Sequence, residues 1–195
     1  MVGEVKMKKI VLVLILLVAI FFPSASFAGD WQGNLNFIGG SRGLNNNWQP
    51  VESQPALDIR VDFGAKDWIA NIVIGISASA KTAACTNTWD CRGSLAEFYV
   101  GGQKYFSVTD AFNPYIGLGI SSVSAKAEFA SYYNKVEYIE NTTGFFIQGG
   151  AMWRLGALNL GLDLRILTGA KFSKDLKGLE DANYAQAGFL IGYNW

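Results

Sequence analysis

Residues 158–166 read Leu-Asn-Leu-Gly-Leu-Asp-Leu-Arg-Ile, so a large aliphatic side chain occupies every second position. Side chains alternate between two faces along a β-strand, whereas a helix repeats about every 3.6 residues. Asn159, Asp163 and Arg165 therefore share one face of this segment, and the leucines share the other. The pattern predicts a β-strand with two chemically different sides.

Seven other segments after residue 30 repeat this alternation. Together they predict eight strands, at residues 31–37, 57–63, 68–79, 97–103, 115–121, 145–154, 158–166 and 186–195. The connections alternate in length: residues 65–67, 107–113 and 155–157 are short, and residues 43–54, 81–94, 125–142 and 169–181 are long and polar. An even number of strands joined in this way is typical of an all-β, antiparallel up-and-down barrel.

The composition indicates what surrounds the barrel. Only 16% of the residues are charged and 50% are hydrophobic, whereas soluble proteins carry about 25% charged residues. No Asp, Glu, Lys or Arg lies on the apolar face of the eight segments, and the polar face is mainly Gly, Ser, Asn and Gln. A soluble barrel such as a lipocalin would bury its apolar face. The two faces therefore favour a transmembrane barrel with its apolar side toward lipid.

Aromatic residues gather at one end of the predicted barrel. Trp and Tyr are enriched at membrane–water interfaces. The residues beside the short turns form a predicted aromatic girdle: Trp31, Trp68, Trp153, Tyr193 and Trp195. Phe145 and the loop residues Trp48, Trp89 and Tyr138 are candidates for the opposite interface. Closure follows from the same environment, because in lipid only a closed barrel satisfies every strand hydrogen bond.

The N-terminus has the composition of an export signal. Lys6, Lys8 and Lys9 precede an apolar run at residues 10–22, and Ser26-Phe27-Ala28 follows as a small-residue cleavage site. These features predict a cleaved signal peptide at residues 1–28 and a barrel domain at residues 29–195. An uncleaved anchor is the alternative, and translation from Met1 or from Met7 fits the pattern equally well.

Cys85 and Cys91 are the only cysteines of the chain. In an exported protein such a pair is interpreted as a disulfide that closes a small loop. Two free thiols or half of a metal site are the alternatives. The chain has no His, so a zinc site would lack ligands. The sequence predicts no catalytic, cofactor-binding or metal-binding residues.

Several charged residues fall on the inward face of the predicted strands. These residues are Asp58, Arg60, Asp62, Glu97, Arg154, Asp163 and Arg165. Because buried charges need partners, we interpret them as a salt-bridge network that fills the lumen. The alternative is a narrow path for small solutes. A further variant is a hydrophobic pocket that opens sideways into lipid and is shaped by inward residues such as Tyr99, Tyr115, Phe146 and Met152.

Three segments carry a family resemblance: residues 113–120 (NPYIGLGI), residues 158–165 and the C-terminal residues 188–195 (GFLIGYNW). On these motifs the whole mature chain resembles the small eight-stranded outer-membrane barrels of Gram-negative bacteria, the group of the OmpA transmembrane domain, OmpX and OmpW. The resemblance implies residence in the outer membrane after export through the periplasm. It also implies that a C-terminal signal is read by the outer-membrane assembly machinery, with Phe189, Ile191, Tyr193 and Trp195 as its residues. The family more often ends in Phe than in Trp.

Function is less constrained than fold. The enzymatic barrels of the outer membrane use His with Ser or Asp, and this chain has no His, so we expect no enzyme. The balance of 16 basic and 16 acidic residues argues against nucleic-acid binding. We expect a monomer that contacts outer-membrane lipids and lipopolysaccharide and has a structural or surface-interaction role. A narrow channel for small or hydrophobic solutes, as in OmpW-like barrels, is the alternative, and a lipid-modifying envelope enzyme is a more distant one.

Overall fold

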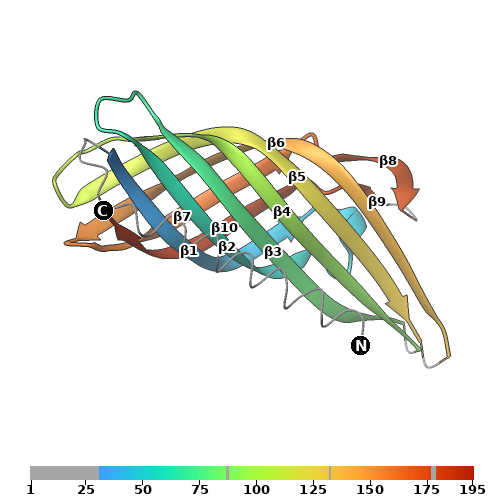
Figure 1. Ribbon diagram of the computed structural model, residues 1–195. Coiled ribbons are helices and arrows are strands. Elements are labelled where there is room, and N and C mark those ends of the chain that lie inside the picture. The colour runs from blue at the N-terminus through green and yellow to red at the C-terminus, as the bar shows by residue number, and fades with distance from the viewer. Residues whose placement is uncertain (1–30, 87, 132, 177–178) are drawn as a thin grey trace, which may run out of the picture. The chain divides into compact units, whose positions relative to one another are not determined.

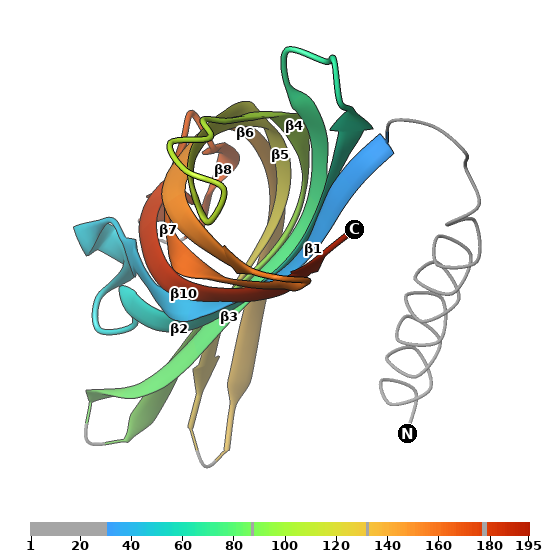
Figure 2. The same ribbon diagram turned by 90° about the vertical axis from the view of Figure 1, so that its left-hand side faces the viewer.

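The computed structural model describes residues 31–195, except residues 87, 132, 177 and 178 (Figure 1). The predicted signal peptide, residues 1–28, lies outside the described residues. Eight strands close into an antiparallel barrel in the order β1-β10-β7-β6-β5-β4-β3-β2 (Figure 2). Their bounds are Trp31–Leu44 (β1), Ser53–Ala65 (β2), Asn71–Thr86 (β3), Trp89–Tyr105 (β4), Phe112–Ala130 (β5), Lys135–Leu155 (β6), Leu158–Thr168 (β7) and Tyr184–Asn194 (β10).

Three short elements accompany the barrel. The 3₁₀ turn η1 (Asn46–Trp48) lies between β1 and β2, and the strands β8 (Lys171–Leu176) and β9 (Leu179–Asp181) form a separate two-stranded sheet between β7 and β10. In the described part of the chain, no helix is long and apolar enough to cross a membrane.

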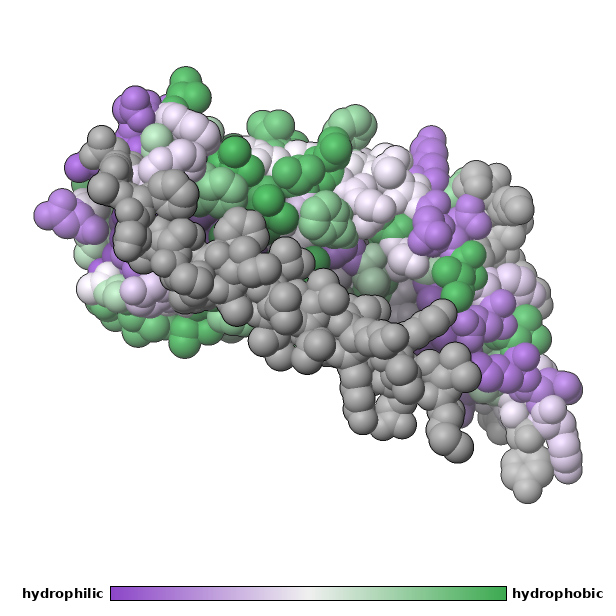
Figure 3. Space-filling model, in the orientation of Figure 1, coloured by the Kyte–Doolittle hydropathy of each residue, from purple (hydrophilic) through white to green (hydrophobic). Residues whose placement is uncertain are grey.

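The alternating apolar and polar residues of the sequence lie on the outside and the inside of the barrel, respectively. On β7, Leu164 and Ile166 are 62% and 56% exposed, whereas Asp163 and Arg165 are buried at 3% and 1%. Figure 3 shows hydrophobic side chains over the middle of the visible barrel surface and hydrophilic ones toward both ends. This distribution is that of a barrel whose outer band faces hydrocarbon and whose ends face water.

Two of the long connections differ from the prediction. Residues 81–94 and 125–142 are mostly strand, because β3 and β4 continue to Thr86 and Trp89, and β5 and β6 continue to Ala130 and Lys135. The prediction ended these strands where large aliphatic side chains stop on the outer face. Strand pairing depends on backbone hydrogen bonds and continues past the apolar band, with Val123, Ala125 and Ala127 buried on the inner face.

The continued strands form a sheet that we call the projecting sheet: residues 80–86, 89–95, 124–130 and 135–143. The β2–β3 ladder ends at the pair Ala56–Ser79, and the β6–β7 ladder ends at Phe145–Thr168. Beyond these pairs the four strands extend past their neighbours, and Figure 1 shows the two hairpins reaching out from one end of the barrel. We call this end the hairpin end. The short turns, the start of β1 and the C-terminus lie at the opposite end, the turn end.

Close contacts between neighbouring strands explain two glycine pairs of the sequence, Gly39-Gly40 and Gly101-Gly102. A Cβ atom on Gly40 would meet the backbone of Ala187 and Gly188 on β10, and one on Gly101 would meet the backbone of Leu118 and Gly119 on β5. The neighbouring Gly39 has only a side-chain atom of Leu57 at 3.8 Å. One glycine of each pair therefore allows close strand packing in a tightly curved barrel.

Candidate functional site

The lumen is filled by charged side chains at the middle level of the barrel. Three arginines and three acidic residues meet there: Arg42 on β1, Asp58 and Arg60 on β2, Glu97 on β4, and Asp163 and Arg165 on β7. All six are buried. Their formal charges cancel, which is the condition for keeping such groups away from water.

Glu97 is the acceptor at the centre of this cluster. Its Oε1 accepts a hydrogen bond from Nη2 of Arg165 at 2.6 Å, and its Oε2 accepts one from the Tyr184 hydroxyl at 2.5 Å. Nη2 of Arg42 lies 3.5 Å from the same Oε2. Arg42 also donates to Ser77 and Gln186. Glu97 thus joins side chains from three strands other than its own.

A second group of ion pairs lies beside the first. Nη2 of Arg60 is 2.8 Å from Oδ2 of Asp163, and Asp163 also accepts a hydrogen bond from the Tyr115 hydroxyl at 2.5 Å. Asp58 accepts a hydrogen bond from Tyr99 at 2.8 Å and lies 3.8 Å from Nη1 of Arg165. The guanidinium carbon of Arg165 sits 3.6 Å from the centroid of the Tyr99 ring. Aromatic rings and charges therefore occupy the same cross-section.

The residues considered for a lateral pocket are packed in the interior of the barrel. Tyr99, Tyr115, Phe146 and Met152 are all buried, at 0–4% exposure. The Tyr99 and Phe146 rings pack edge to face with centroids 5.3 Å apart. Met152 and Tyr115 belong to one apolar cluster with Ile38 and Leu190. These side chains fill space that the pocket hypothesis left open.

Asp62 lies apart from the ion pairs, in a layer of amides nearer the turn end. Its carboxylate accepts hydrogen bonds from Asn34 (2.8 Å), Asn71 (3.0 Å) and the Tyr105 hydroxyl (2.8 Å). The predicted salt bridge of Asp62 is thus replaced by neutral donors. Side-chain amides can satisfy a buried carboxylate in this way, and parity along a strand does not reveal which donor the neighbouring strands supply.

Arg154 also differs from the prediction. It is half-buried at the mouth of the turn end, where its guanidinium carbon lies 5.6 Å from the Tyr105 ring centroid. Among the described residues it forms no ion pair. Five of the seven predicted residues therefore form ion pairs in the lumen. Asp62 is held by neutral donors instead, and Arg154 lies where the barrel opens.

Arg42 is the functional residue that the sequence analysis missed. Residues 43–54 were expected to be a loop, and the first strand was followed only to Phe37. β1 continues to Leu44, and Arg42 shares the inward parity of Asn34 and Asn36. Extending that alternation along the strand would have identified it.

An apolar cap closes the hairpin end of the lumen. Trp48 on η1 is 2% exposed, its Nε1 donates to the carbonyl of Asp181 at 2.9 Å, and its ring lies 6.5 Å from that of Phe172 on β8. Val51, Leu95 and Leu179 belong to the same buried cluster. The suggestion that Trp48 contributes to an outer aromatic girdle is therefore wrong. The ring turns inward, where Val51, Leu95 and Phe172 supply apolar partners.

The projecting sheet carries charges outside and apolar groups inside. Lys126 lies 2.9 Å from Glu137, and Lys135 lies 3.0 Å from Glu128. The hydrogen bond from Lys135 lowers the pKa of the Glu128 carboxyl, and the hydrogen bond to Glu137 raises the pKa of Lys126. Both groups therefore stay charged around neutral pH, as an aqueous surface requires.

The hairpin tips hold two further features. The predicted disulfide between Cys85 and Cys91 is present, joins β3 to β4 and has a Cα–Cα distance of 5.6 Å. Tyr133, between β5 and β6, is 87% exposed. One hairpin thus carries a covalent link near its tip, and the other carries an exposed aromatic side chain.

The aromatic residues predicted for the girdle lie at the turn end. Trp31, Trp68, Trp153, Tyr193 and Trp195 are all 43–49% exposed. The Tyr193 and Trp195 rings stack with centroids 6.4 Å apart. The residues proposed as the assembly signal are exposed at 48–76%: Phe189, Ile191 and Tyr193 on β10, and Trp195 directly after it.

Among the residues that the structure describes, no three His, Cys, Asp or Glu side chains lie close enough together to hold a metal ion. The buried acids already accept hydrogen bonds from Arg, Tyr and Asn side chains. The chemistry that this arrangement supplies is charge pairing within a filled lumen.

A closed ring of eight antiparallel strands, apolar outside and charged inside, defines the class of the fold: the small β-barrel of the bacterial outer membrane. Solved structures agree. The chain is similar to Ail, the attachment invasion locus protein of Yersinia pestis, in complex with the heparin analogue sucrose octasulfate. The TM-score is 0.61 and the identity 10%, over 85% of this chain and 99% of that chain.

Two other outer-membrane proteins show the same likeness. A major outer membrane protein of Thermus thermophilus matches with a TM-score of 0.57 and 6% identity, over 85% of this chain and 99% of that chain. OprG of Pseudomonas aeruginosa matches with a TM-score of 0.52 and 15% identity, over 86% and 96%. Comparison with family models and with curated proteins finds no match. The eight-stranded outer-membrane barrel expected from the sequence is confirmed as the fold.

Proposed function

We propose that this chain is exported to a bacterial outer membrane, where it acts without catalysis as a closed barrel that presents the projecting sheet at the cell surface. The observation that carries this proposal is the filled lumen: Arg42, Arg60 and Arg165 are fully enclosed and paired across its middle. Because the charged side chains of the lumen are paired with one another, the groups that remain available to a partner are those at the two ends of the barrel.

The filled cross-section argues against the channel alternative. Eight strands leave an interior just wide enough for side chains. Here the space holds three guanidinium groups together with the rings of Tyr99, Tyr115 and Tyr184, and the cap around Trp48 closes the hairpin end. A solute would have to break several buried ion pairs to pass.

The projecting sheet supports the surface role. Past Ser79, the β3 side of the sheet extends beyond the β2 ladder and presents a strand edge, and such an edge can pair with a strand of a partner. Exposed aromatic side chains such as Tyr133 are typical of recognition sites. Ail, which shares the fold, has been solved in complex with a heparin analogue.

The absence of His supports a role without catalysis. The lumen hydroxyl groups of Ser77 and Ser121 accept hydrogen bonds from Arg42 and Arg165. A protonated guanidinium cannot act as the general base that a serine nucleophile needs. The buried groups are therefore organised for stability.

Conductance tests the closed lumen. We expect the refolded protein in a planar lipid bilayer to show no conductance above that of the protein-free bilayer, because the ion pairs at the middle level occupy the cross-section. An open porin reconstituted in the same way serves as the positive control. Stable, reproducible conductance steps would disprove closure and favour the channel.

Cysteine labelling in whole cells tests the membrane placement. Tyr133 lies at the hairpin end and Val108 at the turn end, with 87% and 64% exposure. We expect a membrane-impermeant maleimide to label Tyr133→Cys in intact cells and Val108→Cys only after the outer membrane is permeabilised. The native cysteines form a disulfide and do not compete. Labelling in the reverse order, or of both variants alike, contradicts the placement.

A further inference from the structure

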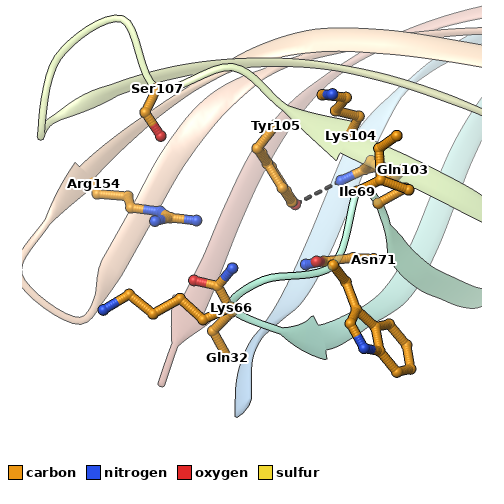
Figure 4. Close-up of a pocket in the computed structure, with 11 residues that line it drawn as sticks. Gln32, Lys66, Ile69, Asn71, Gln103, Lys104, Tyr105, Ser107 and Arg154 are labelled. Atoms are coloured by element: carbon orange, nitrogen blue, oxygen red, sulfur yellow. Dashed lines mark hydrogen bonds between the residues drawn. The ribbon is translucent and has the colours of Figure 1, made fainter. Parts of the chain in front are cut away.

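The rim of the barrel has a notch at the turn end. β3 begins at Asn71, which pairs with Gln103, whereas β4 runs on to Tyr105 and there pairs only with Tyr115 of β5. A cavity of about 240 Å³ lies in this notch. Figure 4 shows its lining residues, with Arg154, Lys66 and Gln32 on one side of Tyr105, and Gln103 and Lys104 on the other.

Three cations line the cavity: Lys66 from the β2–β3 turn, Lys104 from β4 and Arg154 from β6. Across the described part of the chain none of them forms an ion pair. Nε of Arg154 is buried without a hydrogen-bond partner. Nζ of Lys104 lies 6.0 Å from the centroid of the Phe106 ring and has no acidic partner among the described residues. An anion in a cavity lined by three cations would gain from each of these side chains that turns toward it.

Acidic groups do not neutralise the cavity from within. Its lining contains no Asp or Glu. Asp67 and Asp110 belong to the turns of this end but do not line it. Asp62 is not a lining residue, and its carboxylate is already held by Asn34 and by the lining residues Asn71 and Tyr105. The neutral lining groups include the side chain of Gln32, whose amide can donate hydrogen bonds to an oxyanion. The Ser107 hydroxyl also lines the cavity, but it already donates to Oδ1 of Asn113 at 3.1 Å.

The position of the cavity restricts the anion. Trp68 and Ile69 line its outer side, and Trp68 belongs to the half-exposed aromatic row that includes Trp153, the neighbour of Arg154. Such a row marks the headgroup level of a bilayer. The cavity thus spans the rim between the barrel mouth and the lipid-facing surface, where the phosphates of the lipid headgroups lie.

We propose that this cavity binds the phosphate of an anionic phospholipid in the leaflet at the turn end, with Lys66, Lys104 and Arg154 as its ligands and Ile69 beside the acyl chains. The net positive lining selects a lipid with net negative charge over a zwitterionic one. The inference rests on the membrane placement proposed above, which the cysteine labelling tests independently.

Native mass spectrometry of the folded full chain in non-ionic detergent tests this site. The probes are phosphatidylglycerol, phosphatidylcholine and diacylglycerol with identical acyl chains. We expect phosphatidylglycerol to be retained about tenfold more tightly than diacylglycerol, with phosphatidylcholine between them. The triple variant Lys66→Gln/Lys104→Gln/Arg154→Gln should remove this preference.

A matched variant removes the same charge from the hairpin end: Lys81→Gln/Arg92→Gln/Lys171→Gln should retain phosphatidylglycerol like the unmodified protein. Equal retention of diacylglycerol, or an equal loss in both triple variants, overturns the proposal. Displacement of phosphatidylglycerol by equimolar inorganic phosphate would identify a free-phosphate site and overturn the lipid assignment. If the triple variant does not fold, the single variants Lys66→Gln and Lys104→Gln, both at exposed positions, provide the test, and unchanged lipid preference in both counts against the site.

Discussion

Replacing Glu97 by Gln is expected to lower the free energy of unfolding of the barrel by about 3–5 kcal/mol, the cost of removing one partner from a buried ion pair. Glu97 is the shared acceptor for Arg165, Arg42 and the hydroxyl of Tyr184. The amide keeps the shape but not the charge, so two buried guanidinium groups lose their nearest carboxylate. Urea unfolding of the protein in lipid vesicles, followed by tryptophan fluorescence, measures the loss.

Two variants control this experiment. Glu137→Gln makes the same chemical change in the 2.9 Å pair with Lys126 on the projecting sheet, where the side chains are 35% and 34% exposed, and should cost about 1 kcal/mol or less. The double variant Glu97→Gln/Arg165→Met restores the charge balance of the lumen and should regain most of the loss. Equal destabilisation by Glu97→Gln and Glu137→Gln would show that the lumen pairs do not hold the barrel together.

Replacing Trp48 by Ala is expected to destabilise the apolar cap by about 3–5 kcal/mol, as for other buried Trp side chains. The ring is 2% exposed, and its Nε1 binds the carbonyl of Asp181. Because the cap lies outside the strand ladders of the barrel, we expect local opening rather than global unfolding. Hydrogen exchange should therefore rise in residues 45–52 and 179–182 while the barrel strands stay protected.

The same variant tests whether the ion pairs block the lumen without the cap. Trp48→Ala should remain non-conducting, because the ion pairs of Arg60 and Arg165 lie below the cap and are untouched. Tyr133→Ala, a change at an 87% exposed position, controls for the loss of an aromatic side chain at this end. Exchange in residues 45–52 that matches the unmodified protein, or unfolding of the whole barrel, would refute a locally stabilised cap.

The sequence predicted the fold closely because lipid imposes a simple rule on a strand. Every outward side chain between the two interfaces must be apolar, and the inward one is free to be polar, so period-two alternation identifies strand, face and register together. This is why the alternation at residues 158–166, repeated in seven other segments, indicated the class. The same rule explains the error at residues 81–94 and 125–142: the strands continue into water, where the outward residues become Lys126, Glu128 and Glu137, and the lipid signal ends before the strand does.

The sequence predicted which charged residues lie inside the barrel, but it did not predict which of them pair with each other. Parity along each strand places Asp58, Arg60, Asp62, Glu97, Asp163 and Arg165 inside. Which carboxylate meets which guanidinium depends on the stagger between strands that are far apart in the chain, as for Arg165 and Glu97. Stagger is set by the closure of the whole ring, and no local sequence signal carries it.

The amino-acid sequence by itself determined the number of transmembrane strands and which face of each meets lipid, because both follow from local alternation and the cost of placing charge in hydrocarbon. Only the tertiary structure decided that Arg42, Arg60 and Arg165 fill the middle of the lumen beneath a cap around Trp48, and that Asp62 is held by amides and the Tyr105 hydroxyl. It also decided that Lys66, Lys104 and Arg154 share a notch at the rim. Each of these arrangements joins residues from different strands, and closure of the barrel alone brings them within reach of one another.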